Sequence, residues 1–285
     1  MSVSKVGVLG AGQMGSGIAQ VCLMSGHQVV MSDVSETVLD RSRAGIVKGL
    51  DILVRKEKIT AQGKERALSG LVATTDPGDF ASCDLVVEAA TEREELKLSL
   101  FRKLDEVVPA GRILATNTSS ISITKIAAAT KRPAQVIGMH FMNPVPLMKL
   151  VEVIPGLQTS TETFEATMAF ARALGKEPVP ANDSPGFIAN RILMPMINEA
   201  AYALMEGVAK AADIDAIMRM GANHPMGPLA LADLIGLDTC LEVMNILQQG
   251  LGDSKYRPCP LLRRHVDAGY LGKKTGRGFY AYEKA

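Results

Sequence analysis

The first thirty-odd residues alternate between apolar runs and a glycine-rich turn. An apolar run at residues 5–9 is followed by glycines at 10, 12, 15 and 17, and then by an apolar stretch with helical spacing at 18–24. A second apolar run at 28–31 ends at Ser32 and Asp33. This order of strand, turn, helix and strand predicts one βαβ unit.

Apolar runs and helical spacing continue to alternate as far as residue 174. Further strands are expected at residues 71–75, 84–88, 112–115, 136–139 and 149–154, with helices at 92–108, 122–129 and 161–174. Residues 36–68 have helical spacing that breaks near residues 60–63, which predicts an inserted helical hairpin. Because several strands are almost continuously apolar, the sheet is expected to be covered on both faces. The pattern predicts an α/β fold with a Rossmann-type doubly wound sheet.

The pattern changes near residue 183. Residues 181–186 are rich in turn formers, and strand signals stop after them. Helices are expected at residues 187–205, 213–220, 228–235, 238–251 and 260–268. Asp183 or Ser184 is expected to cap the first of these helices, with Pro185 in its first turn. The sequence thus predicts two domains, residues 1–183 and an all-helical domain at residues 184–285.

The glycine-rich turn has the spacing and context of a dinucleotide-binding loop. Gly10 permits a tight turn, Gly12 lets a pyrophosphate approach the backbone, and Gly15 lets the helix pack closely on the strand. Asp33 can accept hydrogen bonds from an adenosine ribose and would repel a 2′-phosphate, so NAD is expected rather than NADP. The expected cofactor-binding residues in the turn are Gly10, Ala11, Gly12, Gln13, Met14 and Gly15.

Of the four histidines, His140 is the strongest candidate for a catalytic residue, because of its position in the sequence. It follows the apolar run at 136–139, and ligands of open α/β sheets bind beyond the carboxyl ends of strands. Glu152 falls inside the apolar run at 149–154, where an unpaired carboxylate would be costly. A carboxylate on one imidazole nitrogen fixes the tautomer and raises the basicity of the other, as a general base requires. From this pattern alone, a purely structural histidine remains the alternative.

Five motifs occur in a fixed order along residues 5–283. They are Gly-Ala-Gly-Gln-Met-Gly at 10–15, Asn-Thr-Ser-Ser-Ile at 117–121, His-Phe-Met-Asn-Pro at 140–144 with Glu152, Asp-Ser-Pro-Gly-Phe-Ile-Ala-Asn-Arg at 183–191, and Gly-Lys-Lys-Thr-Gly-Arg-Gly-Phe-Tyr at 272–280. Together they resemble the L-3-hydroxyacyl-CoA dehydrogenase family. The resemblance implies NAD-dependent oxidation of a 3-hydroxyacyl-CoA, such as 3-hydroxybutyryl-CoA, to the 3-oxoacyl-CoA, such as acetoacetyl-CoA, and the reverse reduction.

The resemblance also implies roles for individual residues. His140 would be the general base and Glu152 would orient it, while Ser119 and Asn190 would hold the reactive end of the substrate. By residue type alone, Ser119 and Asn190 would pass as capping or solvated side chains. Four more residues are implied to lie near NAD, the first two near its nicotinamide ribose: Glu92, Lys97, Asn143 and Lys274.

Charge is nearly balanced overall but uneven along the chain. The sequence has 31 Lys and Arg against 30 Asp and Glu, a net charge of +1, so no global field favours a nucleic acid or an anionic membrane surface. Residues 40–66 hold eight basic and four acidic residues, which predicts a site for the CoA phosphates on the hairpin. The resemblance points to Lys56 as a contact. A merely solvated hairpin is the alternative, and Gly49 stands where relatives carry a serine that contacts CoA.

The remaining composition bears on compartment and assembly. The four cysteines form no C-x-x-C pair, so free thiols, a reducing compartment and no metal site are expected. No window approaches about 18 consecutive apolar residues, so no membrane span is expected and the cytoplasm is the predicted location. A homodimer through the second domain is implied by the family and suits its methionine-rich helices.

Three other functions stay open on the sequence. A β-hydroxyacid dehydrogenase would share the glycine motif but needs a lysine on the long helix, where this chain has Asn190 and Arg191. A sugar-acid dehydrogenase of the gulonate type would be distinguished by its substrate. A non-enzymatic NAD-binding protein would show bound NAD without turnover.

Overall fold

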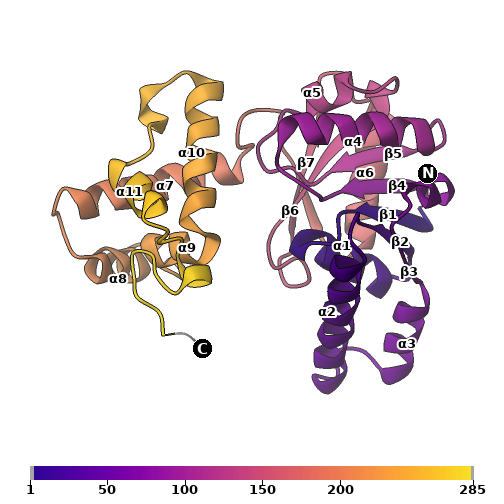
Figure 1. Cartoon of the computed structure of the whole chain (residues 1–285), viewed down its shortest axis with the longest axis horizontal. Helices are drawn as coiled ribbons and strands as arrows, with labels where there is room; N and C mark the ends of the chain where they lie inside the picture. Colours follow the sequence, from indigo (N-terminus) through magenta and orange to yellow (C-terminus); the bar gives the residue numbers. More distant parts are fainter. Residues whose placement is uncertain (1–2, 284–285) are drawn as a thin grey trace. The chain divides into compact units, whose positions relative to one another are not determined.

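An eight-stranded sheet organises the first part of the computed structural model, which describes residues 3–283 (Figure 1). The strands are β1 (Lys5–Leu9), β2 (Gln28–Ser32), β3 (Leu71–Thr74), β4 (Leu85–Glu88), β5 (Ile113–Thr116), β6 (Val136–Phe141), β7 (Leu150–Pro155) and β8 (Glu177–Pro180). They lie in the order β3-β2-β1-β4-β5-β6-β7-β8. Strands β1 to β6 are parallel, β7 is antiparallel to β6, and β8 is parallel to β7. The predicted Rossmann-type doubly wound sheet is confirmed.

Helices cover both faces of this sheet. One apolar core joins the sheet to α1 (Gln13–Met24), α2 (Glu36–Arg55), α3 (Ala61–Ser69) and α6 (Thr161–Ala173). A second core joins it to the 3-10 segment η1 (Pro77–Ser82), α4 (Glu94–Val107) and α5 (Ile123–Ala128). A short 3-10 segment η2 (Pro133–Gln135) precedes β6. Consecutive strand residues enter opposite cores, as Leu114 and Ala115 do, and this explains the continuous apolar runs.

The inserted hairpin consists of α2 and α3 (Figure 1). The hydroxyls of Ser35 and Thr60 cap the two helices at their N-termini. Leu39, Ile46 and Leu50 lie on one face of α2 and are buried in the core. The opposite, charged edge of α2 is left to solvent.

Two strands differ from the sequence prediction. Strand β6 runs two residues beyond position 139, because pairing with the antiparallel β7 continues to Phe141. His140 therefore lies inside a strand and not after it. The sequence predicts no strand at β8, because Pro178 and Pro180 cannot donate to a ladder. Both are tolerated because β8 is at the edge of the sheet.

The chain divides into two compact units, one ending at Ser184 and the other beginning at Pro185. The second contains α7 (Ala189–Met205), α8 (Ala211–Gly221), α9 (Pro228–Ile235), α10 (Leu237–Leu251) and α11 (Pro260–Asp267), with 3-10 segments η3 (Ser254–Tyr256) and η4 (Lys273–Thr275). An apolar cluster joins its helices, and the predicted helical character of this part is confirmed.

The segment before α7 differs in detail from the prediction. Helix α7 starts at Ala189 and not at 187, because Gly186 and Phe187 have φ angles of +73° and +47°, outside the helical region. Asp183 caps α5 instead of α7. Its carboxylate accepts hydrogen bonds from the N–H of Ile123 at 3.0 Å and from the N–H of Thr124 at 2.7 Å. The last residues of the first unit are thereby fixed to that unit.

Two buried aspartates tie the C-terminal segment to the helices of the second unit. Asp215 accepts a hydrogen bond from the hydroxyl of Tyr280 at 2.7 Å, and Asp233 accepts one from the hydroxyl of Tyr282 at 2.9 Å. Burial, and then the hydrogen bond to a carboxylate, raise the pKa of both tyrosines. These contacts make the tail part of the folded unit.

Within residues 3–283, no helix combines the length and the apolar character needed to cross a bilayer. The same residues contain no group of three or more His, Cys, Asp or Glu side chains arranged to hold a metal ion.

Candidate active site

The glycine turn between β1 and α1 combines fixed and open positions. Gly10 has a φ of +99°, and a Cβ added there would lie 2.6 Å from the Cα of Ala90. A Cβ on Gly15 would lie 1.8 Å from the carbonyl oxygen of Gly10, whereas one on Gly12 would meet no atom within 4 Å. Met14 is partly buried against the core. The fold therefore requires Gly10 and Gly15, and Gly12 leaves a space that a ligand can enter.

Asp33 and Asn143 lie at the same turn. The Asp33 carboxylate accepts hydrogen bonds from the N–H of Ala11 at 2.9 Å and from the N–H of Ser35 at 3.2 Å. The Gln13 side-chain amide donates to the Asn143 side-chain oxygen at 3.1 Å, which joins two predicted cofactor residues from distant motifs. Helix α1 begins with no side-chain cap, so its first N–H groups can bind phosphate oxygens. This open, amide-lined cradle with a carboxylate at its edge fits NAD.

His140 and Glu152 face each other across β6 and β7. They are directly paired in the antiparallel register, with His140 Nδ1 at 2.7 Å from Glu152 Oε2. Both are buried, with exposed fractions of 8% and 3%. The carboxylate favours the imidazole tautomer that carries its proton on Nδ1, which leaves the lone pair on Nε2. The pair can therefore act as a base with a fixed orientation at the carboxyl end of β6.

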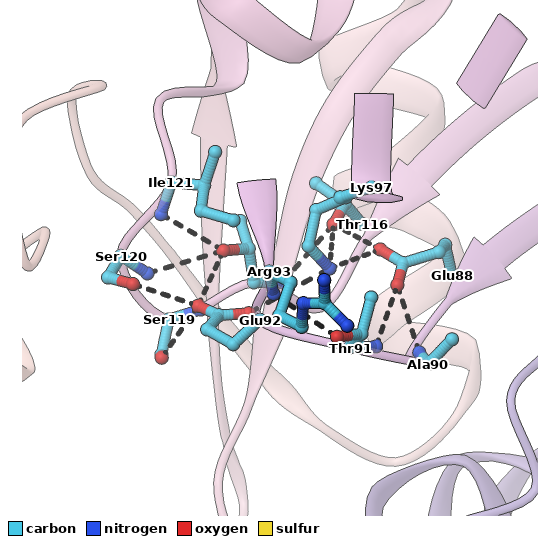
Figure 2. A network of polar contacts seen from close by, with 11 residues as sticks. Glu88, Ala90, Thr91, Glu92, Arg93, Lys97, Thr116, Ser119, Ser120 and Ile121 are labelled. Atoms are coloured by element: carbon cyan, nitrogen blue, oxygen red, sulfur yellow. Dashed lines mark hydrogen bonds and ion pairs between the residues drawn. The ribbon is translucent and has the colours of Figure 1, made fainter. Parts of the chain in front are cut away.

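Ser119 lies in the loop between β5 and α5, where Glu92 binds it (Figure 2). One oxygen of Glu92, Oε1, accepts hydrogen bonds from the Ser119 N–H at 2.7 Å and from the Ser119 hydroxyl at 2.9 Å. It also accepts from the Thr118 hydroxyl at 2.7 Å and from the Ser120 hydroxyl at 2.9 Å. Glu92 and Ser119, two predicted site residues that are 27 positions apart in the chain, are thus in direct contact.

Lys97 lies beside this loop, in a buried polar cluster with Glu88 and Thr116 (Figure 2). Its side chain is 1% exposed, and its Nζ lies 2.5 Å from Glu88 Oε2 and 3.8 Å from Glu92 Oε2. The Thr116 hydroxyl donates to the same oxygen of Glu88 at 2.8 Å. Sequence reasoning missed Glu88, although a carboxylate ending an apolar strand is the kind of signal that singled out Glu152.

The remaining predicted residues lie elsewhere. Lys56 is exposed and forms the C-cap of α2. Asn190 is the second residue of α7, in the second unit. Lys274 also belongs to that unit, where its Nζ contacts the two carboxylate oxygens of Asp238 at 2.6 and 2.7 Å.

The hairpin carries the expected cationic residues. An open hollow on α2 is lined by Asp40, Arg43, Ala44, Val47, Lys48, Asp51, Val54 and Arg55. A Cβ on Gly49 would lie 2.7 Å from the side-chain oxygen of Gln20, so Gln20 occupies the space that a serine side chain would enter.

Comparison with known proteins identifies the family. The 3-hydroxyacyl-CoA dehydrogenase NAD binding domain matches residues 5–184, and the C-terminal domain of the same family matches residues 186–282. The chain belongs to the 3-hydroxyacyl-CoA dehydrogenase family. The family, the dehydrogenase class and NAD as the cofactor, all predicted from the sequence, are confirmed.

Two relatives and one solved structure align with this dehydrogenase over at least 97% of their length. A probable 3-hydroxybutyryl-CoA dehydrogenase from Deinococcus radiodurans is 58% identical, and the alignment covers 98% of this chain and 100% of the relative. A 3-hydroxybutyryl-CoA dehydrogenase from Bradyrhizobium diazoefficiens is 55% identical, with 99% and 97% covered. The crystal structure of (S)-3-hydroxybutyryl-CoA dehydrogenase from Ralstonia eutropha has a TM-score of 0.97 at 52% identity, with 99% and 100% covered.

Proposed function

We propose that this dehydrogenase oxidises (S)-3-hydroxybutyryl-CoA to acetoacetyl-CoA and catalyses the reverse reduction. The observation that carries the proposal is the buried His140–Glu152 pair at the carboxyl end of β6, in the same sheet as a glycine turn that fits NAD. Full-length similarity to proteins named for that reaction supports the choice of substrate.

His140 and Glu152 carry the proton transfer in this mechanism. In oxidation, the substrate C3 hydroxyl gives its proton to Nε2 of His140, and the carboxylate of Glu152 stabilises the imidazolium that forms. In reduction, the imidazolium returns the proton to the C3 oxygen. When bound, NAD supplies the acceptor for the hydride from C3. Burial of the pair excludes water, which strengthens the interaction between its two charges.

Other residues are assigned to binding. Ser119 and Asn190 hold the C3 oxygen, and the glycine turn binds the pyrophosphate of NAD. Asp33 binds the adenosine ribose, and its charge disfavours NADP. Glu92, Lys97, Asn143 and Lys274 are assigned to NAD binding, as the family resemblance implies.

The CoA phosphates are assigned to the hairpin. Lys56 is exposed at the C-terminus of α2, and the hollow on this helix is lined by three basic side chains and two acidic ones. A local excess of positive charge on this hairpin would bind an anionic cofactor segment despite the balanced total charge.

We assign a homodimer and a cytoplasmic location to the enzyme. The second unit exposes apolar side chains that a second copy would cover, among them Ile192 at 68%, Ile217 at 61% and Met220 at 80%. The four cysteines are buried free thiols, which suits a reducing compartment.

The proposal is tested by initial rates of NADH oxidation with acetoacetyl-CoA and with longer 3-oxoacyl-CoA thioesters. The same rates are measured with NADPH in place of NADH. We expect acetoacetyl-CoA and NADH to be preferred. His140→Gln should lower kcat by about 10²–10⁴-fold, because the proton acceptor is lost.

The controls separate binding from chemistry. NADH affinity of the His140→Gln variant, measured by fluorescence titration, should equal that of the wild type. Turnover of gulonate in place of acyl-CoA thioesters would contradict the proposed substrate class. Near wild-type turnover by His140→Gln would contradict the role of His140 as the general base.

A further inference from the structure

The loop that carries Ser119 is held by hydrogen bonds of its own and by four hydrogen bonds to the carboxylate of Glu92. Thr118 organises the loop by accepting hydrogen bonds from the N–H groups of Ser120 at 3.3 Å and Ile121 at 3.0 Å. The Thr118 hydroxyl in turn donates to Glu92 Oε1, which also binds the N–H and the hydroxyl of Ser119 and the hydroxyl of Ser120 (Figure 2). Four donors from three consecutive residues therefore converge on one oxygen atom.

Glu92 is itself in contact with a buried cation, Lys97. Its second oxygen lies 3.8 Å from Nζ of Lys97, and this buried cation is fixed by Glu88 at 2.5 Å and by the hydroxyl of Thr116 at 3.5 Å. Glu88 and Lys97 are 0% and 1% exposed, so the cluster is anchored in the sheet and not in solvent. Hydrogen bonds to a charged group are the stronger ones, so loss of the charge on Glu92 should loosen the loop.

We propose that Glu92 is the positioning residue for Ser119. The Ser119 hydroxyl donates to Glu92 Oε1, and in this proposal it turns to the C3 oxygen when substrate binds. The Ser119 N–H remains on Glu92 throughout, so the backbone stays in place while the hydroxyl rotates. This role rests on the function assigned to Ser119 above, and it is additional to the ribose contact that the family resemblance implies for Glu92.

A double-mutant cycle separates positioning from a direct cofactor contact. We expect Ser119→Ala and Glu92→Gln each to lower kcat at saturating NADH, by about tenfold for Glu92→Gln, which corresponds to one lost charged hydrogen bond. In the Ser119→Ala background, Glu92→Gln should lower kcat by a much smaller factor, because the group that it positions is gone and only the contribution of a ribose contact is left. A ribose contact alone would reduce kcat by the same factor in both backgrounds.

Amide hydrogen exchange gives a readout that is independent of turnover. Exchange in the segment 118–121 should be faster in Glu92→Gln than in the wild type, and unchanged in Ser119→Ala, where the backbone N–H still donates to Glu92. Glu95→Gln is the matched control, because Glu95 is exposed in the first turn of α4, three residues after Glu92, and its kinetics and exchange should equal those of the wild type. Glu92→Asp keeps the charge but withdraws the oxygen by one methylene, and should show the same pattern if Glu92→Gln does not fold.

The outcomes are distinguishable. Equal effects of Glu92→Gln in both backgrounds, or unchanged exchange at 118–121, would overturn the positioning role alone. Wild-type turnover by Ser119→Ala would overturn the role of Ser119 and the positioning role with it. Absence of turnover with any 3-oxoacyl-CoA would overturn the proposed function, while the exchange measurement would still decide whether Glu92 holds the loop.

Discussion

Lys176 is a buried cation that is held by carbonyl oxygens. Its Nζ donates to the carbonyls of Val145 and Met148, in the loop that follows His140. The side chain is 8% exposed, and burial lowers its pKa. Lys176 thus fixes the loop that carries Asn143 and leads into β7.

Replacing Lys176 with methionine keeps the side-chain volume but removes both hydrogen bonds. We expect the free energy of unfolding to fall by about 1–3 kcal/mol, measured by urea denaturation. Lys149→Met is the control, because Lys149 pairs with Glu177 at the surface, where both side chains are at least 70% exposed, and its loss should change stability little. Equal stability of the two variants would show that the buried contacts do not hold the loop.

At the scale of elements, the turn between β1 and α1 has one glycine that folding requires and another that ligand binding requires. A methyl group on Gly15 would meet the backbone of Gly10 at 1.8 Å, and backbone cannot move aside as a flexible side chain can. A methyl group on Gly12 would meet nothing, and the φ of −68° at Gly12 suits alanine. Glycine is therefore needed at position 15 for folding and at position 12 for ligand binding.

Gly15→Ala should lower the free energy of unfolding by about 1–3 kcal/mol or more, because α1 must shift from the sheet. Gly12→Ala should keep wild-type stability and weaken NADH binding by at least about tenfold, because the methyl group fills the space for the pyrophosphate. Denaturant unfolding and fluorescence titration measure the two effects. The interpretation fails if both variants change stability equally.

The strands that the sequence predicts best are the continuous apolar runs bounded by turn residues. The runs that became β1, β4 and β5 are apolar on both sides because both faces are buried. The direction of β7 and the existence of β8 depend on pairing, which is a property of the sheet and not of one segment.

The same limit applies to the site. The sequence indicates His140 and Glu152 as a pair because a buried charge needs a partner, and the two side chains are in contact at 2.7 Å. The contact between Glu92 and the loop at 118–120 joins residues that are 26 to 28 positions apart in the chain, so no local pattern shows it.

At the scale of the whole molecule, the free energy of unfolding should fall in alkaline solution. Burial raises the pKa of Cys22 and Cys240 to about 12 and that of Cys83 to about 11, and the pKa values of Tyr280 and Tyr282 are raised as well. These groups keep their protons in the folded protein, while the unfolded chain releases protons from its thiols near pH 9 and from its tyrosines near pH 10. Stability is therefore fully present below about pH 9 and decreases above it.

Each of the deeply buried thiols, Cys22 and Cys240, should lower the free energy of unfolding by about 1.4 kcal/mol per pH unit between its unfolded and folded pKa values. Urea denaturation from pH 8 to pH 11 measures the slope. Cys240→Ala should flatten it by one such contribution, since one titrating thiol is removed. A free energy of unfolding that stays constant across this range would contradict the assignment.

The distance between His140 and Glu152 is set by the sheet and not by the loop that connects β6 to β7. The two residues are 12 positions apart in sequence but lie on facing rungs of antiparallel strands. During evolution, the connecting loop can gain or lose residues without separating them, as long as the strands keep their register. Remote members of the family are therefore better recognised by a histidine and a glutamate on paired rungs than by a fixed spacing in the sequence.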